Sequence, residues 1–299
     1  MENKMYDIII IGAGPAGMTA AVYAGRSNKE VALIDKNGFG GNIANSPIVE
    51  NIPGFKSISG IDFATNLYEQ VCALPTINHI IDEAVLLNYK HGMIIVSLAS
   101  GEKVFGKSLI IATGTEHKML DLPTQNIYYC ATCDGPLFKN KSVIVVGSGN
   151  TGATYALDLA NYCKQVYLCD ITTKMCCEPV LSSRIEKSSK ISWLPNCSIK
   201  SVTNNKEGKL TSITLSTYES IKVAAIFSAI GMSPKTDFTN DLVEKNTAGF
   251  IKQLTTNTTL VPNIFVAGDC ADKEIRQVTT ACSDGTIAAI HAIKYLDTL

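Results

Sequence analysis

Two cysteines, Cys130 and Cys133, are separated by two residues and followed immediately by the carboxyl group of Asp134. A C-x-x-C pair can form half of a four-ligand zinc site, but the chain has no second C-x-x-C and no histidine near this one. Two thiols at this spacing can instead close a disulfide on a single turn, and Asp134 can supply or take the proton that thiol–disulfide exchange requires. The pattern therefore favours a redox-active cysteine pair and predicts no metal centre.

A glycine-rich turn near the start of the chain indicates a second kind of chemistry. Residues 12–17 read Gly-Ala-Gly-Pro-Ala-Gly, after an apolar run at 6–11 and before a helix-like stretch at 18–25; the next apolar run, at 31–34, ends in Asp35. This order of strand, glycine turn, helix, strand and acid is the fingerprint of a dinucleotide-binding βαβ unit. The glycines let the backbone approach a pyrophosphate at the helix N-terminus, and we expect Asp35 to accept hydrogen bonds from a ribose.

The same fingerprint occurs a second time. Residues 147–152 read Gly-Ser-Gly-Asn-Thr-Gly, lie between apolar runs at 143–146 and 166–169, and are followed by Asp170. Both copies place the acid 23 positions after the first glycine. A single glycine fingerprint is a weak signal, but two copies in register predict two nucleotide-binding folds. The candidate residues of a second nucleotide site are Gly147, Gly149, Gly152 and Asp170.

Three further apolar runs, at 108–114, 224–231 and 263–269, contain or end in glycine and are typical of buried strands. The first two flank the second glycine turn, as expected when one nucleotide-binding domain is inserted into another. The length of 299 residues also suits two domains. The sequence therefore predicts an α/β protein with two Rossmann-like, three-layer ββα-type dinucleotide-binding domains, one inserted into the other.

Charge and hydropathy exclude other classes of protein. The 26 Lys and Arg against 27 Asp and Glu give a net charge of −1, which offers no electrostatic footprint for nucleic acid. Residues 8–25 carry no charge, but the run contains four glycines and a proline and lacks the basic segment and cleavage site of a signal peptide. We therefore expect a soluble, cytoplasmic protein with neither a nucleic acid nor a membrane as its partner.

The string Cys-Ala-Thr-Cys-Asp at residues 130–134, with most of the rest of the chain, closely resembles the low-molecular-weight, bacterial-type thioredoxin reductases. The resemblance implies FAD bound in a discontinuous domain of residues 1–114 and 236–299, a smaller domain of residues 115–235 that carries the cysteine pair, and a homodimer. Asn42 stands where this family often has glutamine, which is also an amide. The residues that the resemblance implies for FAD binding are Gly12, Ala13, Gly14, Pro15, Ala16, Asp35, Lys36, Gly40, Gly41, Asn42, Asn51, Val85, Ala112, Thr113, Gly114, Asp269, Arg276, Gln277 and Val278.

The resemblance also implies a division of labour around the cysteine pair. Cys133 would receive electrons from FAD, Cys130 would attack the disulfide of thioredoxin or a similar dithiol protein, and Asp134 would serve as the acid. A flavin suits this task because it accepts electrons from a donor and passes a pair to a disulfide. The two domains are expected to swing relative to each other, because a dithiol buried against a flavin cannot also face a protein partner.

The residues leave two electron donors open. Relatives that use NADPH carry His-Arg-Arg and a further Arg after the second βαβ strand to bind the 2′-phosphate, whereas residues 170–178 contain Lys174 as their one cation and no arginine. The carboxylate of Asp170 would also repel that phosphate, so NADPH is disfavoured. Asp170 and the intact glycines suit NADH. The missing basic residues instead match the ferredoxin-dependent flavin thioredoxin reductases, which take single electrons from reduced ferredoxin.

Two alternative functions depart from thioredoxin reduction. The chain could be a flavin-bearing redox sensor that docks a partner according to its thiol state, without turnover, and the missing donor motif is the one feature that favours this alternative. It could also reduce a protein disulfide other than that of thioredoxin. Oxidases and ferredoxin–nicotinamide reductases on the same scaffold lack the C-x-x-C pair, so its presence argues against them.

Overall fold

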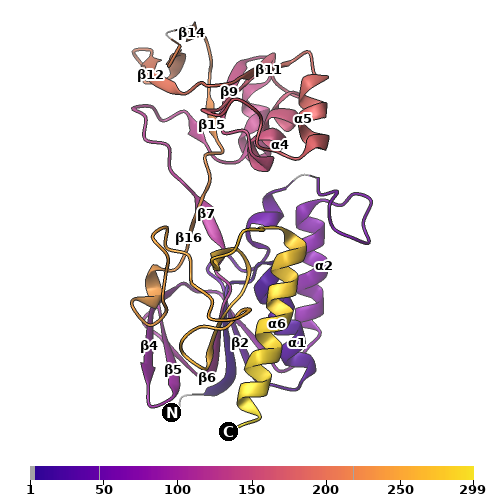
Figure 1. Ribbon diagram of the computed structural model, residues 1–299, viewed down its shortest axis with the longest axis vertical. Coiled ribbons are helices and arrows are strands. Elements are labelled where there is room, and N and C mark those ends of the chain that lie inside the picture. The colour runs from indigo at the N-terminus through magenta and orange to yellow at the C-terminus, as the bar shows by residue number, and fades with distance from the viewer. Residues whose placement is uncertain (1–3, 47, 218) are drawn as a thin grey trace. The chain divides into compact units, whose positions relative to one another are not determined.

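The structure is a computed structural model that describes residues 4–46, 48–217 and 219–299. The chain divides into two compact units, Met1–Glu116 with Ser233–Leu299 and His117–Met232. Two short strands, β7 (Thr115–His117) and β16 (Met232–Pro234), pair with each other where the chain passes between the units (Figure 1). Among the described residues, no helix is both long and apolar enough to cross a membrane.

A seven-stranded sheet forms the centre of the first unit, in the order β3-β2-β1-β6-β5-β4, with β17 paired to the last residues of β6. Strands β3, β2, β1, β6 and β17 run parallel, whereas β5 pairs antiparallel with the first half of β6 and with β4, which is the edge strand. The carboxyl ends of β1, β6 and β17 therefore meet at one edge, which is where parallel α/β sheets bind ligands. The strands are β1 (Met5–Ile11), β2 (Val31–Ile34), β3 (Ile77–Ile80), β4 (Ala84–Lys90), β5 (Met93–Leu98), β6 (Lys103–Ile111) and β17 (Ile264–Val266).

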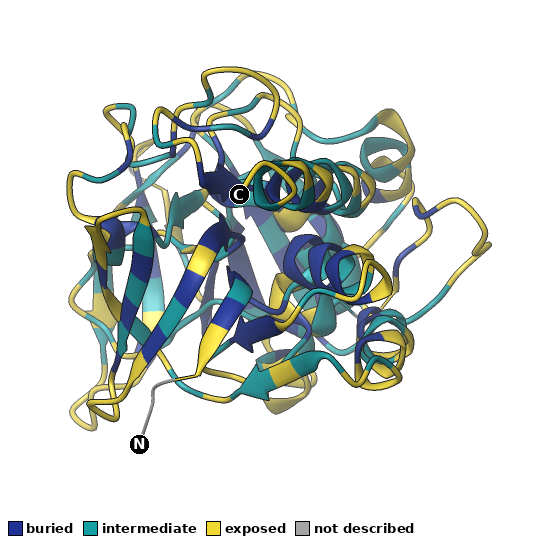
Figure 2. Cartoon of the chain, turned by 90° about the horizontal axis from the view of Figure 1, so that it is seen from below, coloured by how far each residue is buried: buried dark blue, intermediate teal, exposed yellow. Residues whose placement is uncertain are grey.

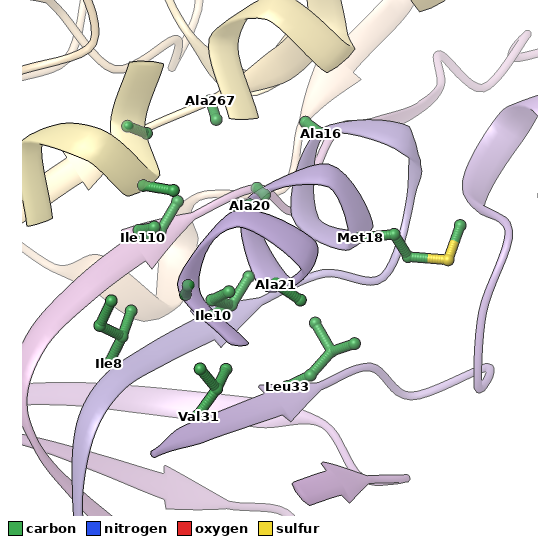
Figure 3. Packing of buried hydrophobic residues seen from close by; sticks show 14 of the residues in the cluster. Ile8, Ile10, Ala16, Met18, Ala20, Ala21, Val31, Leu33, Ile110 and Ala267 are labelled. Atoms are coloured by element: carbon green, nitrogen blue, oxygen red, sulfur yellow. The ribbon is translucent and has the colours of Figure 1, made fainter. Parts of the chain in front are cut away.

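The isoleucine run of β1 is buried on both faces of this sheet. Ile8 and Ile10 pack into a cluster that contains Ala20 of the first helix (Figure 3). Ile9 and Ile11 belong to a second cluster, which contains residues of β4 and β5. Neighbouring residues of a strand point to opposite faces, so a strand covered on both sides needs apolar residues at every position. The first unit therefore has three layers: the helices on one face of the parallel strands, the parallel strands themselves, and the antiparallel strands β4 and β5 on the other face.

The helices α1 (Pro15–Arg26), α2 (Gly60–Cys72) and α6 (Val278–Leu296) contribute to the first of these clusters. Helices α1 and α6 approach closely because small residues line their contact: a Cβ added to Gly285 would lie 2.1 Å from the carbonyl oxygen of Ala16. In the helices seen end-on in Figure 2, buried faces and exposed faces lie on different sides of the axis. This is the amphipathic pattern of a helix that covers a sheet.

The second unit repeats the plan around a five-stranded parallel sheet in the order β11-β10-β9-β15-β8. A three-stranded antiparallel sheet, β12-β13-β14, completes the unit. The predicted fold class, an α/β protein with two Rossmann-like domains, is confirmed. The elements are β8 (Ile127–Tyr128), α3 (Ala131–Asp134), β9 (Ser142–Val146), α4 (Asn150–Leu159), β10 (Gln165–Cys169), α5 (Pro179–Glu186), β11 (Ile191–Leu194), β12 (Ile199–Asn204), β13 (Leu210–Leu215), β14 (Ser220–Ile221) and β15 (Ile226–Ser228).

The first and third glycines of each turn are required by the fold. Gly12 and Gly147 have φ angles of +106° and +104°, in the left-handed region that favours glycine. A Cβ added at Gly17 would lie 1.7 Å from the carbonyl oxygen of Gly12, and one added at Gly152 would lie 1.8 Å from that of Gly147. The third glycine therefore lets the helix pack directly onto the turn that precedes it.

The middle glycine of each turn has no such structural reason. Gly14 and Gly149 have φ angles of −79° and −68°, which any residue adopts. A Cβ added at Gly149 would meet no atom within 4 Å, and one added at Gly14 would meet only the Cα of Gly41, at 3.8 Å. The open space in front of both helices is where a pyrophosphate would approach the backbone.

We predict that Gly152→Ala lowers the free energy of unfolding by at least roughly 1–3 kcal/mol, because its methyl group overlaps a backbone carbonyl that cannot move away alone. Gly149→Ala is the matched control in the same turn, and its effect should stay within about 1 kcal/mol, the cost of an alanine at a helix N-cap. Denaturant titrations of both variants measure the difference. Equal losses of stability would contradict the packing role assigned to Gly152.

Candidate active site

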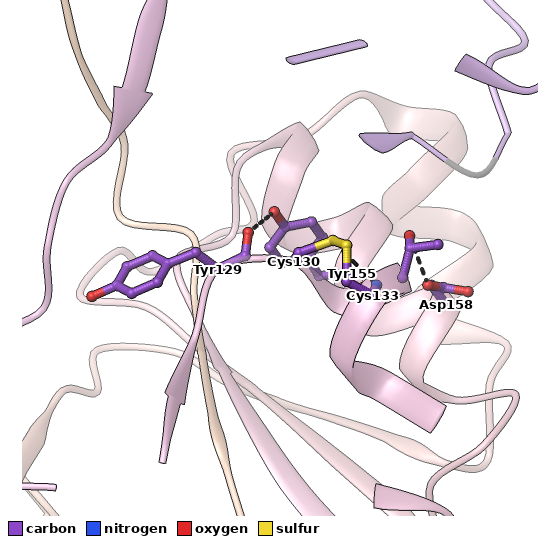
Figure 4. Close-up of a disulfide and its surroundings, with 6 residues drawn as sticks. Tyr129, Cys130, Cys133, Tyr155 and Asp158 are labelled. Atoms are coloured by element: carbon purple, nitrogen blue, oxygen red, sulfur yellow. Dashed lines mark hydrogen bonds between the residues drawn. A yellow bond between two sulfur atoms is a disulfide. The ribbon is translucent and has the colours of Figure 1, made fainter. Parts of the chain in front are cut away.

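A disulfide joins Cys130 to Cys133, whose Cα atoms lie 5.4 Å apart (Figure 4). Cys130 precedes the short helix α3 as its N-cap, and its Sγ accepts a hydrogen bond from the backbone N–H of Cys133, at 3.1 Å. Cys133 is exposed and Cys130 is half-buried. We call residues 129–135 the redox turn.

Apolar packing fixes the redox turn on the second unit. The rings of Tyr128, Phe138 and Phe227 contact one another, with centroids 5.1 to 5.8 Å apart, on either side of the turn in sequence. Ala131 is fully buried in the same cluster. A Cβ added at Gly135 would lie 3.0 Å from the side chain of Leu159, so the turn packs tightly against α4. The cysteines are therefore presented from a rigid support.

Two side chains of α4 hold the redox turn by hydrogen bonds (Figure 4). The hydroxyl of Tyr155 donates to the carbonyl oxygen of Tyr129 at 2.5 Å, and the hydroxyl of Thr132 donates to the carboxylate of Asp158 at 3.2 Å. Sequence reasoning did not identify Tyr155 or Asp158. Their spacing of three residues, which places two side chains on one face of a helix, was the signal available.

The carboxyl and phenol groups around the redox turn favour their protonated forms. Burial raises the pKa of Asp134 above its ordinary value. Burial, together with the negative charge of Asp134, raises the pKa of Tyr155 to about 12. Burial also raises the pKa of Asp158, although hydrogen bonds from Thr132 and Asn161 oppose the shift. A carboxyl group beside the disulfide thus retains its proton to a higher pH than an exposed aspartate does, as a proton donor should.

The first glycine turn is tied to the acid that follows β2. The backbone N–H of Ala13 donates to Oδ2 of Asp35 at 2.8 Å, and that of Asn37 donates to Oδ1 at 2.8 Å. The N–H of Gly40 donates to the carbonyl oxygen of Ala13 at 2.8 Å, which closes the following loop over the turn. Asp35 therefore positions the turn, and each carboxylate oxygen retains a lone pair for a ribose hydroxyl.

The residues predicted to bind FAD lie in the first unit, mostly at or near the ends of its parallel strands. Asn42 donates to the carbonyl oxygen of Thr115 at 3.0 Å, and Asn51 donates to the side chain of Gln277 at 3.2 Å. The guanidinium of Arg276 lies 4.2 Å from the ring centre of Phe250. The set occupies the turn before α1 (Gly12, Ala13, Gly14), the first residues of α1 (Pro15, Ala16), the loop after β2 (Asp35, Lys36, Gly40), η1 (Gly41–Asn45), the segment after β6 (Ala112, Thr113, Gly114), η4 (Gly268–Cys270) and the start of α6 (Arg276, Gln277, Val278).

Val85 lies on β4 with almost half of its surface exposed. Lys36 is placed close to it in the fold, because its ammonium pairs with Glu83, two residues before Val85, at 2.8 Å. Segments 47 residues apart in sequence therefore come together beside the acid of the first fingerprint. This proximity is compatible with the expected binding of one end of a dinucleotide.

One buried carboxylate oxygen among these residues is suited to a hydroxyl group of FAD. Oδ1 of Asp269 is buried and, among the described residues, has no hydrogen-bond partner. Burial raises the pKa of Asp269. An unpaired buried acceptor is costly, and a hydroxyl of the ribityl chain of FAD could satisfy it. The pyrophosphate of FAD suits the N-terminus of α1, because no side chain caps this helix and the space beside Gly14 is open.

The second glycine turn repeats these contacts and adds one. The backbone N–H and the hydroxyl of Ser148 both donate to Oδ2 of Asp170, at 2.6 and 2.7 Å, and the N–H of Thr172 donates to Oδ1 at 3.1 Å. Burial alone would raise the pKa of Asp170, but these hydrogen bonds outweigh it and the pKa lies below its ordinary value. The acid therefore stays ionised at the point where a ribose would lie.

The loop after Asp170 closes over the second turn as the corresponding loop does in the first unit. The N–H of Cys176 donates to the carbonyl oxygen of Ser148 at 3.1 Å, and Asn150 and Glu178 exchange two hydrogen bonds. Ile171, with 76% of its surface exposed, and the thiol of Cys176 face solvent here. The described residues contain no group of three His, Cys, Asp or Glu that could hold a metal ion.

Comparison with known proteins places this geometry in a family. The family model "Pyridine nucleotide-disulphide oxidoreductase" matches residues 6–285. The chain belongs to this family. A thioredoxin reductase of Bacillus subtilis is 34% identical over 100% of this chain and 97% of its own, and one of Ureaplasma parvum is 37% identical over 99% and 98%. A crystal structure of Lactococcus lactis thioredoxin reductase, 30% identical, covers 98% of this chain and 100% of its own with a TM-score of 0.94.

Membership of the pyridine nucleotide-disulphide oxidoreductases confirms the enzyme class expected from the sequence, an FAD-dependent disulfide oxidoreductase. It also accounts for the combination of features that the two units carry. One C-x-x-C disulfide accompanies two dinucleotide folds, and such an enzyme needs all three: a place for flavin, a fold suited to a nicotinamide nucleotide, and a disulfide to reduce.

We predict that Asp134→Asn moves stability and activity in opposite directions. The folded protein binds the Asp134 proton more tightly than the unfolded chain, so ionisation lowers stability as the pH rises through the raised pKa, and the loss persists to neutral pH. The amide removes this loss and should increase the free energy of unfolding at pH 7 but not below about pH 3. Disulfide reduction should fall by about 10²-fold or more. Unchanged turnover would contradict the role of Asp134 as the acid.

Proposed function

We propose that this flavoenzyme is a thioredoxin reductase, which delivers an electron pair through FAD to the Cys130–Cys133 disulfide and from there to the disulfide of thioredoxin or a similar dithiol protein. The observation that carries the proposal is the closed C-x-x-C disulfide beside a carboxyl group of raised pKa. The curated relatives that match the whole chain are named thioredoxin reductases, which supports it. The proposal includes a homodimer and a swing of the two domains relative to each other, as the resemblance implies.

We assign FAD to the discontinuous domain of residues 1–114 and 236–299. FAD, when bound, accepts electrons from a donor and passes a pair to the disulfide. In this assignment the N-terminus of α1 holds the pyrophosphate, Asp35 orients a ribose, and Oδ1 of Asp269 accepts a hydroxyl group of the ribityl chain. The residues named above for FAD provide the rest of the contacts, and residues 115–235 form the second domain.

The two cysteines take different roles because their environments differ. After reduction, the hydrogen bond from the Cys133 backbone N–H stabilises a thiolate on Cys130, which makes Cys130 the nucleophile. Its sulfur attacks one sulfur of the partner disulfide and forms a mixed disulfide, and Asp134, as the acid, passes a proton to the released partner thiolate. Cys133 then attacks the sulfur of Cys130 in the mixed disulfide and its thiol proton goes to the second partner sulfur, so the Cys130–Cys133 disulfide forms again and the partner leaves as a dithiol.

We predict that this asymmetry is measurable in single-cysteine variants of the redox turn. In Cys133→Ser the backbone N–H remains, so the pKa of the Cys130 thiol should lie below the ordinary value of about 8.5. In Cys130→Ser the remaining Cys133 thiol has no such donor among the described residues, and its pKa should lie nearer that value. The rate of alkylation against pH, measured on the peptide containing residues 130–133, compares the two. Both variants should lose disulfide reduction, and a lower pKa for Cys133 would reverse the roles.

We propose NADH as the donor, bound at Gly147, Gly149, Gly152 and Asp170. The two glycine turns share their φ angles, their close third glycine, their open middle glycine and their bond to the following acid, so the second fold retains the features that suit a dinucleotide in the first. The ionised Asp170 disfavours the 2′-phosphate of NADPH, and the exposed Ile171 and Cys176 offer it no cation. Reduced ferredoxin is the second candidate, favoured by the same lack of cations.

We predict that anaerobic mixing with NADH bleaches the oxidised flavin band faster than mixing with NADPH. Asp170→Asn should weaken the binding of NADH by roughly 1.5–3 kcal/mol, the value of a hydrogen bond to a charged group. Gly149→Ala should slow reduction by NADH at least about tenfold, because its methyl group fills the open approach to the helix without disturbing the fold.

Photochemical reduction of the flavin is the control, because it bypasses the nucleotide and should be equal in all variants. If reduced ferredoxin reduces the flavin, NADH does not, and neither Asp170→Asn nor Gly149→Ala changes the rate, then ferredoxin and not NADH is the donor. If no donor reduces the flavin at a useful rate, the redox sensor without turnover gains instead.

A further inference from the structure

The second unit carries an excess of positive charge that the proposed reaction does not use. Residues 117–232 contain 12 Lys and Arg against eight Asp and Glu, whereas the rest of the chain contains 14 against 19. Lys141, Lys164 and Lys190 each directly precede one of the three neighbouring strands β9, β10 and β11. Parallel strands begin at the same edge of a sheet, so these lysines meet at the edge opposite the glycine turn. With Lys139 and Lys187 we call them the basic edge.

Backbone hydrogen bonds place the lysines side by side. The N–H of Lys164 donates to the carbonyl oxygen of Lys141 at 2.9 Å, and the N–H of Val166 donates to that of Lys190 at 2.8 Å. All five lysines are exposed, and none forms an ion pair with a carboxylate in the part of the chain that the structure describes. The ammonium of Lys190 donates to the carbonyl oxygen of Ala160 instead. The ammonium of Lys141 lies 5.7 Å from the ring centre of Phe138, so the charges of the basic edge contact neutral groups and no carboxylate among the described residues pairs with them.

The basic edge adjoins the redox turn through the last residues of α4 and the segment that follows them. On one side of this segment Asp158 accepts the hydroxyl of Thr132, and Leu159 packs against Gly135. On the other side the carbonyl oxygen of Tyr162 accepts the N–H of Asn140, which lies between Lys139 and Lys141. Residues 158–162 therefore contact both the redox turn and the basic edge, since the carbonyl oxygen of Ala160 also accepts the ammonium of Lys190.

We infer that the basic edge is a docking surface for an acidic patch bordering the disulfide of the partner protein. The inference rests on the proposed function, because it concerns the protein whose disulfide Cys130 attacks. Clustered like charges repel one another and do not stabilise the fold. Opposite charges on a partner accelerate association and select among partners, with an effect that salt weakens. Because a disulfide with an acidic border suits this surface, it should react faster than one with a basic border.

The test uses the full-length enzyme loaded with FAD and reduced photochemically, so that no electron donor is needed. The probes are a disulfide-linked peptide flanked by three glutamates, the same peptide flanked by three lysines, and neutral hydroxyethyl disulfide. The rate at which each probe reoxidises the enzyme is measured in low and high salt. We expect the glutamate peptide to react at least about tenfold faster than the lysine peptide at low salt, and the ratio to shrink at high salt.

The triple variant Lys141→Gln, Lys164→Gln, Lys190→Gln should reduce that ratio to near one and leave the rate with hydroxyethyl disulfide unchanged. The matched control is Lys90→Gln, Lys103→Gln, Lys206→Gln, which removes the same charge from exposed lysines outside the basic edge. It should preserve most of the ratio. Equal losses in both triples, or no preference in the wild type while the neutral disulfide is reduced, would overturn the docking surface and leave the proposed function intact. Failure to reduce any disulfide would overturn both.

Discussion

The hydrogen bond between the glycine turn and the acid after the next strand organises each half of this protein. It runs from Ala13 to Asp35 in one unit and from Ser148 to Asp170 in the other. The bond can form only where the backbone turns sharply at the end of the first strand, which the left-handed first glycine allows. Once it forms, strand end, helix N-terminus and acid share one edge of the sheet, and this edge is the part of the fold suited to a dinucleotide.

Helix α4 connects the two chemistries of the second unit. Its first residue follows the open glycine of the turn, whereas its second half contributes Tyr155 and Asp158 to the redox turn. A helix of 10 residues is about 15 Å long, so one rigid element separates the nucleotide fold from the disulfide by a fixed distance. Small residues on its buried face, such as Ala153 and Ala156, let it lie close to the sheet. A change in this helix would therefore affect both sites.

The two edges of the sheet in the second unit carry opposite charges. At the carboxyl edge of the second sheet, three hydrogen bonds keep Asp170 ionised. At the amino edge, lysines precede three adjacent strands. The sheet thus separates an edge that carries an ionised carboxylate from an edge that carries exposed lysines. Neither property is visible in the net charge of −1, because the two units carry opposite excesses that cancel.

The sequence by itself determined the two glycine turns, the buried strands and the redox cysteines, because each depends on residues within about 25 positions of one another. Only the tertiary structure decided which groups surround them. Asp158 and Thr132 are 26 residues apart, and Asn42 and Thr115 are 73 apart, so no local pattern predicts their hydrogen bonds. The same limit applies to burial. The raised pKa of Asp134 and the unpartnered oxygen of Asp269 follow from what the folded chain packs around a carboxyl group, which spacing along the sequence does not record.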